Sequence, residues 1–387
     1  MTRLAHVWSS DMGLSLSLPY LRPFLARGWE VFGICPPGPR VELVTREGVR
    51  WLPHGITRAI DPAGDAAEVA RLYRCFREHR FDVVHTHNAK TGILARLVAT
   101  AARVPVILHT HHGMVFSMES PRRVRWPAAA LERAASARVD RLLVQSGEDR
   151  DALVETGAAN PNDISLVGNG IDLSKFDEAR FVEQRRAVRA ELGVGERDVL
   201  FFSAGRVVKE KGFVELFEAY ERAHAKEPRV RLAVAGPADT DRGLGVPDRS
   251  LEAARRAGVL LLGERADMPE LYAASDVVAL ASWREGLPRV LIEGAAMGKP
   301  LLATDVRGCR EVVKDTSWGV RVPVRDAEAL AGALVAMTAD AELRATVGAH
   351  NRAAARERYD LAVVVGRIER IYDELLAKKG RQQQKPR

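Results

Sequence analysis

The chain has 387 residues, of which 47% are hydrophobic and 28% charged, so its composition excludes a disordered or fibrous protein and predicts two globular domains. A formal net charge of +7 favours anionic partners. Nucleic acid is not expected among them, because neither zinc-finger spacing nor an aromatic-rich RNA-binding signature is present. The widely spaced Cys35, Cys75 and Cys309 form no disulfide or metal pattern, which fits a reducing cytoplasm. No apolar run reaches the ~20 residues that span a bilayer, and no signal peptide is recognised.

Short apolar runs alternate with helical patterns along the first half of the chain. Strands are predicted at 4–8, 30–35, 82–85, 105–110, 141–145 and 164–167. Helices are predicted at 15–27, 65–79, 90–102 and 124–138. This β-α alternation predicts an α/β fold with a parallel, doubly wound sheet.

The alternation weakens at 172–198 and then resumes, which predicts a second domain of the same kind. Its first strand is predicted to start at Val199 (VLFFSAG), and further strands at 230–235, 259–262, 276–281, 300–303 and 319–322. Helical patterns follow at 340–358 and 361–377. We expect domains at 1–175 and 190–360 and a polar, disordered tail at 378–387. Ligands should bind at the carboxyl ends of the strands, in a cleft that the two domains face.

The segment SAGRVVKEKG at 203–212 follows one of these strands and precedes a helical pattern. Its Arg206 and Lys211 flank a short turn, while Gly205 and Gly212 allow backbone to approach a ligand at a helix N-terminus. Two cations in that setting suit a diphosphate. The alternative is a solvated basic turn, because Lys209 and Glu210 add charges of both signs.

The segment SWREGLPRVLIEGAAMG at 282–298 follows a later strand, and Pro288 is well placed to begin a helix. Glu285 precedes that helix and Glu293 lies within it, so the two carboxylates can accept hydrogen bonds from two sets of hydroxyls. The backbone N–H groups of Gly286 and Leu287 are available at the helix mouth. The alternative is that Glu285 caps the helix and Glu293 pairs with Arg289 or Lys299.

Taken together, these motifs resemble those of the retaining GT-B glycosyltransferases of family 4. The match comprises Gly205-Arg206 to Lys211-Gly212, Glu285 to Glu293, Asn169 to Asp172 and Ala233 to Pro237. The resemblance implies two Rossmann-like domains facing a cleft, an N-terminal acceptor domain and a C-terminal nucleotide-sugar domain, with the helix at 361–377 packing back on the first. Segment 304–313 is similar to bacterial enzymes that build surface polysaccharides and lipopolysaccharide.

The activity that the resemblance implies is retaining, metal-independent transfer of a hexose or N-acetylhexosamine. The donor would be a nucleotide sugar, UDP-linked by the same implication, and the acceptor a lipid-linked glycan. No cofactor and no metal is expected. Two rival functions stay open: a nucleotide-sugar epimerase of the same fold, and a non-catalytic protein that binds nucleotide sugars or anionic lipid.

The resemblance also implies roles for individual residues of the donor site. Arg206 and Lys211 would hold the donor diphosphate, Glu293 the ribose, and Glu285 with the backbone of Gly286 and Leu287 the transferred sugar.

The family that the sequence resembles has a T-x-H-G pattern at this strand end, which maps to Thr110 and His112 in the segment HTHHG. The resemblance implies that His112 lies beside the transferred sugar as a catalytic residue with Glu285. The register can slip by one, to His111. A metal site at these histidines is disfavoured, because no matching set of carboxylates or histidines lies nearby in sequence.

The remaining candidates lie at other strand ends. Relatives often have two adjacent glycines in the loop 9–14 that admit acceptor or diphosphate; this sequence departs from that pattern and keeps only Gly13, which is expected at the donor diphosphate. Asp11 either contacts an acceptor hydroxyl or caps a helix starting near Ser15. Lys90 either meets an acceptor phosphate or is a surface lysine at a helix start. The triplet Asp239-Thr240-Asp241 resembles a metal motif but is interpreted as a solvated loop.

Residues 121–138 form a basic, partly amphipathic helical pattern. Arg122, Arg123 and Arg125 adjoin Trp126, a residue type that favours the membrane interface. In the enzymes that the sequence resembles, a basic helix of the N-terminal domain docks on the membrane. The resemblance therefore implies a cytoplasmic protein that docks peripherally on the anionic inner face of the cell membrane. The alternative is a solvated surface helix.

Overall fold

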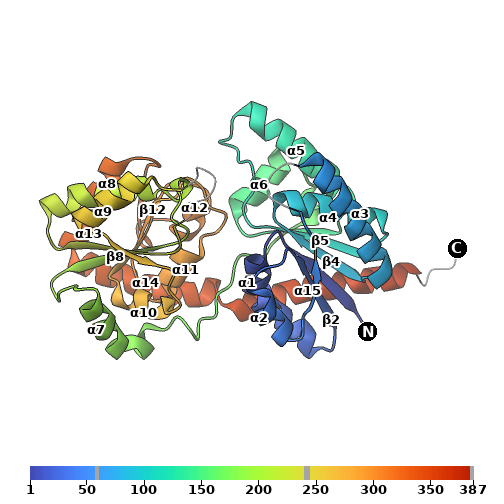
Figure 1. Cartoon of the computed structure of the whole chain (residues 1–387), viewed down its shortest axis with the longest axis horizontal. Helices are drawn as coiled ribbons and strands as arrows, with labels where there is room; N and C mark the ends of the chain where they lie inside the picture. The colour runs from blue at the N-terminus through green and yellow to red at the C-terminus, as the bar shows by residue number, and fades with distance from the viewer. Residues whose placement is uncertain (57–60, 239–244, 384–387) are drawn as a thin grey trace. The chain divides into compact units, whose positions relative to one another are not determined.

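The computed structural model describes residues 1–56, 61–238 and 245–383. The chain divides into two compact units, Met1–Gly168 with Ala362–Arg387 and Asn169–Leu361 (Figure 1). Each unit is built on its own parallel sheet, which confirms the predicted α/β class with two Rossmann-like domains.

In the described part of the first unit, seven parallel strands form a sheet of order β3-β2-β1-β4-β5-β6-β7. The strands are β1 (Arg3–Val7), β2 (Glu30–Cys35), β3 (Arg50–Pro53), β4 (Val83–His87), β5 (Val106–His111), β6 (Arg141–Val144) and β7 (Ile164–Leu166). The helices are α1 (Asp11–Ala26), α2 (Val41–Arg46), α3 (Pro62–His79), α4 (Ala89–Ala101), α5 (Arg122–Ser136), α6 (Gly147–Glu155) and α15 (Leu361–Gln383), with a 3-10 turn η1 (Pro161–Asp163). The strand order reverses between β1 and β4, and a crevice at such a switch point is where doubly wound sheets bind ligands.

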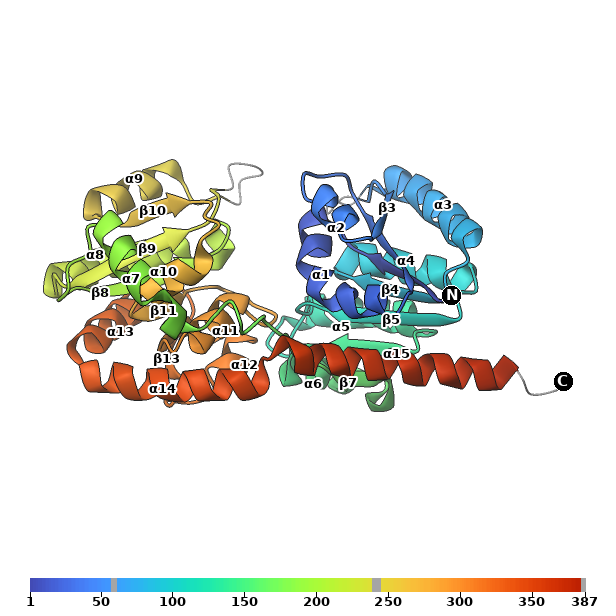
Figure 2. The ribbon, with the colours of Figure 1, turned by 90° about the horizontal axis from the view of Figure 1, so that it is seen from below.

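The two faces of this sheet are covered by different helices. Leu4, Val83 and Leu108 face a core that includes α1 and, from the far end of the chain, Ile368 and Tyr372 of α15. The opposite face packs against α3 and α4. Figures 1 and 2 both show α15 (red) running along this unit, far from the rest of the unit in sequence.

Six strands of the described second unit form a parallel sheet of order β10-β9-β8-β11-β12-β13. They are β8 (Val199–Ala204), β9 (Val230–Ala235), β10 (Leu260–Gly263), β11 (Val277–Leu280), β12 (Leu301–Thr304) and β13 (Gly319–Val322). The helices are α7 (Val182–Glu191), α8 (Phe213–Lys226), α9 (Asp248–Ala257), α10 (Met268–Ala274), α11 (Arg289–Ala296), α12 (Cys309–Val312), α13 (Ala327–Ala339) and α14 (Ala341–Arg358). Two 3-10 turns, η2 (Glu178–Phe181) and η3 (Lys209–Lys211), complete this unit.

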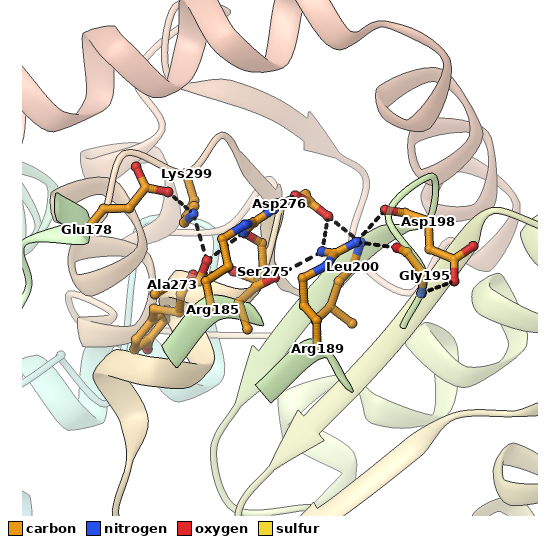
Figure 3. A network of polar contacts seen from close by, with 12 residues as sticks. Glu178, Arg185, Arg189, Gly195, Asp198, Leu200, Ala273, Ser275, Asp276 and Lys299 are labelled. Atoms are coloured by element: carbon orange, nitrogen blue, oxygen red, sulfur yellow. Dashed lines mark hydrogen bonds and ion pairs between the residues drawn. The ribbon is translucent and has the colours of Figure 1, made fainter. Parts of the chain in front are cut away.

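The segment expected to join the two domains belongs to the second unit. Phe176 and Val188 pack into its core. On α7, Arg189 contacts an Asp276 oxygen at 2.8 Å and also donates to the carbonyl of Gly195 at 2.7 Å (Figure 3). The unit boundary therefore falls at Gly168, earlier than the expected junction, because these charged residues are held by partners at the amino-terminal edge of the sheet.

The end of the chain also differs from the expectation. Helix α15 continues to Gln383, so the stretch 378–383, expected within a disordered tail, is helical, and 384–387 lie outside the described residues. Among the residues described, no helix is both long and apolar enough to cross a membrane.

Candidate active site

Three loops of the second unit meet at the carboxyl ends of β8, β11 and β12, and glycines allow the contact. Gly212 has φ +70°, and a Cβ there would lie 1.9 Å from the Ala281 carbonyl oxygen. Gly308 has φ +78°, and a Cβ there would lie 2.3 Å from the Gly286 carbonyl oxygen. Any side chain at either position would force these loops apart, so both glycines are needed for close approach.

Lys211 and Glu285 lie together where these loops meet. The Lys211 Nζ is 2.6 Å from Glu285 Oε1, and the Ser282 hydroxyl donates to the same oxygen at 2.6 Å. The Glu285 side chain is only 11% exposed, so the ammonium group compensates a largely buried carboxylate. Glu285 therefore does not act as the helix cap that one reading of the sequence proposed, and α11 instead begins after Pro288 without a side-chain cap.

Arg206 lies at the other end of the same turn. Its Nη2 is 3.6 Å from Glu210 Oε1, and Arg284 approaches the other oxygen of Glu210 at 3.1 Å. Both arginines are substantially exposed, so these ion pairs are weak and an anionic ligand can replace Glu210 as their partner.

Trp283 is a residue of this site that the sequence reasoning missed. Its ring nitrogen donates to Glu215 at 3.0 Å, its backbone N–H donates to the Glu210 carbonyl at 2.9 Å, and the Arg325 guanidinium lies 3.9 Å from its ring centroid. These contacts fix the loop that carries Glu285 against η3. Its position shortly after strand β11 was the sequence feature that could have indicated this role.

Glu293 lies on α11 and accepts hydrogen bonds from two neighbours. The Tyr272 hydroxyl donates to its Oε2 at 2.9 Å, and Arg289 approaches Oε1 at 3.3 Å, so the pairing with Arg289 that the sequence left open does occur. Burial raises the pKa of Glu293, and Arg289 and Tyr272 oppose the shift. Tyr272, on α10, was not predicted, because sequence spacing gives no sign of its contact with α11.

In the first unit, the histidines at the end of β5 point alternately to opposite faces. His109 and His111 pack together with ring centroids 4.4 Å apart. On the other face His112 Nε2 lies 3.0 Å from His87 Nδ1, with Trp8 stacked on His87 at 3.8 Å. The pKa of His112 is lowered, first by burial and then by His111, and a hydrogen bond with the Gln145 side chain opposes the shift.

A cavity of about 190 Å³ opens beside these histidines. Its polar lining includes His111 and Glu132, and its apolar lining includes Met114 and Phe116. Arg96 is fully buried beneath it and holds Glu132 through two contacts of 2.5 and 3.0 Å. Burial opposes ionisation of Glu132, yet hydrogen bonds from His111 and Arg96 hold its pKa well below the ordinary value.

The loop expected at 9–14 is largely helical, because Ser10 caps α1 and Asp11 begins it. The Asp11 carboxylate accepts the backbone N–H of Arg40 at 2.9 Å, which secures the loop after β2. Gly13 lies in the first turn, where a Cβ would come within 2.5 Å of the Trp8 ring. Lys90 lies at the start of α4 and contacts Asp65 of α3 at 2.6 Å.

The predicted basic helix is α5, which contains Arg122, Arg123, Arg125 and Trp126. Trp126 is 49% exposed, and Val124 beside it is similarly open. Arg125 donates to the Met118 carbonyl at 2.5 Å, which ties the preceding loop to the helix. The triplet Asp239 to Asp241 lies outside the described residues.

Two family models match the chain. Residues 21–175 match the model described as Glycosyltransferase Family 4, and residues 184–354 match that of glycosyl transferases group 1. Among curated relatives, the UDP-Gal:alpha-D-GlcNAc-diphosphoundecaprenol alpha-1,3-galactosyltransferase of Escherichia coli is 29% identical, over 74% of this chain and 73% of its own. The D-inositol 3-phosphate glycosyltransferase of Xylanimonas cellulosilytica is 36% identical, over 71% of this chain and 68% of its own.

A solved structure of HepE from Anabaena, in complex with UDP and glucose, has a TM-score of 0.80 at 19% identity, covering 96% of this chain and 100% of that one. At this identity the likeness concerns the fold. With the family models and the curated relatives, it confirms the predicted family and enzyme class. The chain belongs to glycosyltransferase family 4 and is a glycosyltransferase with the GT-B fold.

Proposed function

We propose that this enzyme transfers a hexose or N-acetylhexosamine from a UDP-linked donor to a lipid-linked acceptor, with retention of anomeric configuration and without a metal. The observation that carries the donor half is the cluster at the sheet edge of the second unit, where Lys211 and Ser282 share one oxygen of Glu285. The name of the Escherichia coli relative, which pairs a UDP-sugar with a diphosphoundecaprenol acceptor, supports the substrate classes.

In this proposal the second unit, Asn169–Leu361, which contains the predicted donor domain 190–360, binds the donor. Arg206 and Lys211 would stabilise the charge that grows on the leaving diphosphate, a role that a metal ion fills in other transferases. Glu285, with the backbone of Gly286 and Leu287, would hold the hydroxyls of the transferred sugar.

In this proposal the Glu293 carboxylate would accept a hydrogen bond from a ribose hydroxyl of the donor. Its carboxylate is already oriented by Tyr272 and Arg289, so binding requires little rearrangement. Gly13 near the diphosphate and His112 near the transferred sugar stay predictions.

The first unit, which covers most of the predicted acceptor domain 1–175, would receive the acceptor. Its cavity combines a polar floor at His111 and Glu132 with apolar walls, which suits a sugar ring. Asp11 and Lys90 stay predicted acceptor contacts, although each already has a partner within the unit.

The exposed basic face of α5 would dock on the anionic inner leaflet, where a lipid-linked acceptor resides. Trp126 and Val124 supply apolar contact, and each arginine near the surface adds about 1 kcal/mol at low salt. This role of α5 also fits the surface-polysaccharide enzymes that the sequence resembles.

The test is a matrix of donors and acceptors. Purified enzyme is incubated with UDP-glucose, UDP-galactose and their N-acetyl forms, with and without a prenyl-diphosphate-linked N-acetylglucosamine, and UDP release is measured in excess chelator. We expect release to depend on both substrates, and NMR of the product to show the donor's anomeric configuration. Interconversion of UDP-sugars without acceptor indicates an epimerase instead, and binding without turnover a non-catalytic protein. Inversion at the anomeric carbon, or activity lost on chelation and restored by manganese, refutes the mechanism.

A further inference from the structure

A continuous chain of side-chain hydrogen bonds runs through the core of the first unit. Its links join Thr110 Oγ1 to His85 Nε2 at 2.6 Å, His85 Nδ1 to Tyr372 Oη at 2.5 Å, Tyr372 Oη to His6 Nε2 at 3.1 Å, His6 Nδ1 to His87 Nε2 at 3.0 Å, and His87 Nδ1 to His112 Nε2 at 3.0 Å. His112 also hydrogen-bonds the Gln145 side chain. This series of hydrogen bonds ends at His112, the residue that the sequence analysis predicts beside the transferred sugar.

Strand register brings these groups to one face of the sheet. His6 of β1 pairs with His85 of β4, and two residues on His87 pairs with Thr110 of β5. Residues two apart in a strand point to the same side, so all four side chains face the layer formed by α1 and α15. Tyr372 of α15 is fully buried there and links His85 to His6.

The interior members of the chain are held neutral. Burial lowers the pKa of His6 to about 3, with a further contribution from His112. Burial also lowers the pKa values of His85 and His87, and the neighbouring histidines add to the effect. A neutral imidazole has one N–H donor and one lone-pair acceptor.

Because each neutral imidazole has one donor and one acceptor, the direction of one hydrogen bond in the network determines the direction of the next. Both ring nitrogens of His85, His6 and His87 are occupied, and the Tyr372 hydroxyl donates one hydrogen bond and accepts another. If Tyr372 donates to His6, then His6 must donate to His87, and His87 to His112. The reverse order is the other fully satisfied arrangement. Any mixed order leaves a buried polar hydrogen or a lone pair without a partner, at a cost of about 1–3 kcal/mol.

We propose that this chain is a positioning relay that sets the tautomer and ring orientation of His112, and that His87, His6 and Tyr372 are positioning residues for it. The tautomer of an imidazole is fixed by the hydrogen bond at its other nitrogen, and here that constraint is passed from α15 through His6 and His87 to His112. The catalytic consequence rests on the proposed function and on the predicted role of His112. The tautomer itself can be measured without it.

The same histidine side chains could instead bind a metal ion. Nitrogens of His6, His85 and His87 lie within 4.8 Å of one another, a grouping compatible with a metal ion. A metal would require a lone pair from each ring and would break the links between them. Because every ring nitrogen of these three residues already has a hydrogen-bond partner, the contacts favour the relay.

The test removes one hydroxyl from the middle of the chain. Tyr372→Phe keeps the ring that packs on Phe24, at a centroid distance of 4.9 Å, and deletes only the donor and acceptor. Two-bond ¹H–¹⁵N spectra of histidine-labelled enzyme report the tautomer of each ring. We expect a single His112 tautomer in the wild type and an altered ratio in Tyr372→Phe. The kcat should fall about 10- to 100-fold, with the KM for donor nearly unchanged, because orientation and not binding is lost.

Two further variants make the result decisive. Phe24→Leu weakens packing on Tyr372 without touching a hydrogen bond, so the His112 tautomer should not change. Thr110→Val removes the hydroxyl at the far end and should shift the tautomer even if Tyr372→Phe folds poorly. An unchanged tautomer in both Tyr372→Phe and Thr110→Val overturns the relay. The relay is also overturned if the purified enzyme contains about one metal ion per chain, bound by His6 and His85. An altered tautomer with unchanged turnover leaves the relay intact and removes His112 from the proposed mechanism.

Discussion

Replacing Lys211 by Ala removes a cation with two separate tasks. In the free enzyme its ammonium compensates Glu285, whose side chain is 11% exposed, through a contact of 2.6 Å. In the proposed transition state the same ammonium faces the leaving diphosphate. Loss of one such contact costs about 2–4 kcal/mol of transition-state stabilisation, which corresponds to roughly a 30- to 900-fold fall in kcat.

The fold should tolerate this change better than the chemistry does. Without Lys211, the Glu285 oxygen keeps the Ser282 hydroxyl at 2.6 Å, so the carboxylate is left short of one partner rather than isolated. We expect about 1–3 kcal/mol of lost stability, the cost of an unpaired buried polar group. Urea unfolding measures this loss, and UDP release under saturating donor and acceptor measures kcat.

Lys209→Ala is the matched control, because it removes the same charge from the same 3-10 turn. It should retain near wild-type kcat. The double variant Lys211→Ala with Glu285→Ala should restore stability but not turnover, since it removes the uncompensated carboxylate and leaves the diphosphate without its cation. Wild-type kcat in Lys211→Ala, or an equal loss in Lys209→Ala, would refute the assignment of Lys211 to the leaving group.

Three other outcomes are expected. Glu293→Gln should weaken UDP binding about tenfold in calorimetry, because the carboxylate would lose a charge-assisted hydrogen bond to ribose; an unchanged Kd rules out the ribose role. Changing Arg122, Arg123 and Arg125 together to Glu should abolish sedimentation with anionic liposomes at low salt and spare the thermal unfolding midpoint, whereas equal binding to neutral and anionic liposomes contradicts the docking role. The first unit should lose stability as pH falls below about 6.5, because the unfolded chain then binds protons that the buried His6, whose pKa is about 3, does not. Each such histidine contributes up to about 1.4 kcal/mol of unfolding free energy per pH unit. If urea unfolding of a His6→Gln variant shows the same dependence of unfolding free energy on pH as the wild type, His6 is not its origin.

Sequence patterns predicted most of the sheet framework, because buried parallel strands are continuous apolar runs. Strand β3 (Arg50–Pro53) was missed, since it is a short edge strand that ends in proline and is only partly buried. The start of α1 was placed four residues late, because Ser10 rather than a residue near Ser15 supplies the cap.

The candidate site was predictable only where its residues are close in sequence. The turn with Arg206 and Lys211 and the loop with Glu285 carry spacing signals, and strand order explains why they meet. The contacts of Tyr272 with Glu293 and of Tyr372 with His6 and His85 join separate elements. No local pattern encodes such contacts, because they depend on how helices pack on the sheets.

The contribution of α15 to the first core has a consequence for the order in which the nascent chain folds on the ribosome. Residues Met1–Gly168 leave the ribosome without Ile368, Tyr372 and Leu375, so one face of their sheet stays uncovered while Asn169–Leu361 is synthesised. At about 5–20 residues per second this interval lasts roughly 10–40 s. The second unit is continuous in sequence, so its core does not need α15. The first unit is synthesised earlier, but its core is complete only when α15 has been added. A ribosome that stalls before Tyr372 therefore carries a first unit whose apolar sheet face is open and available to chaperones.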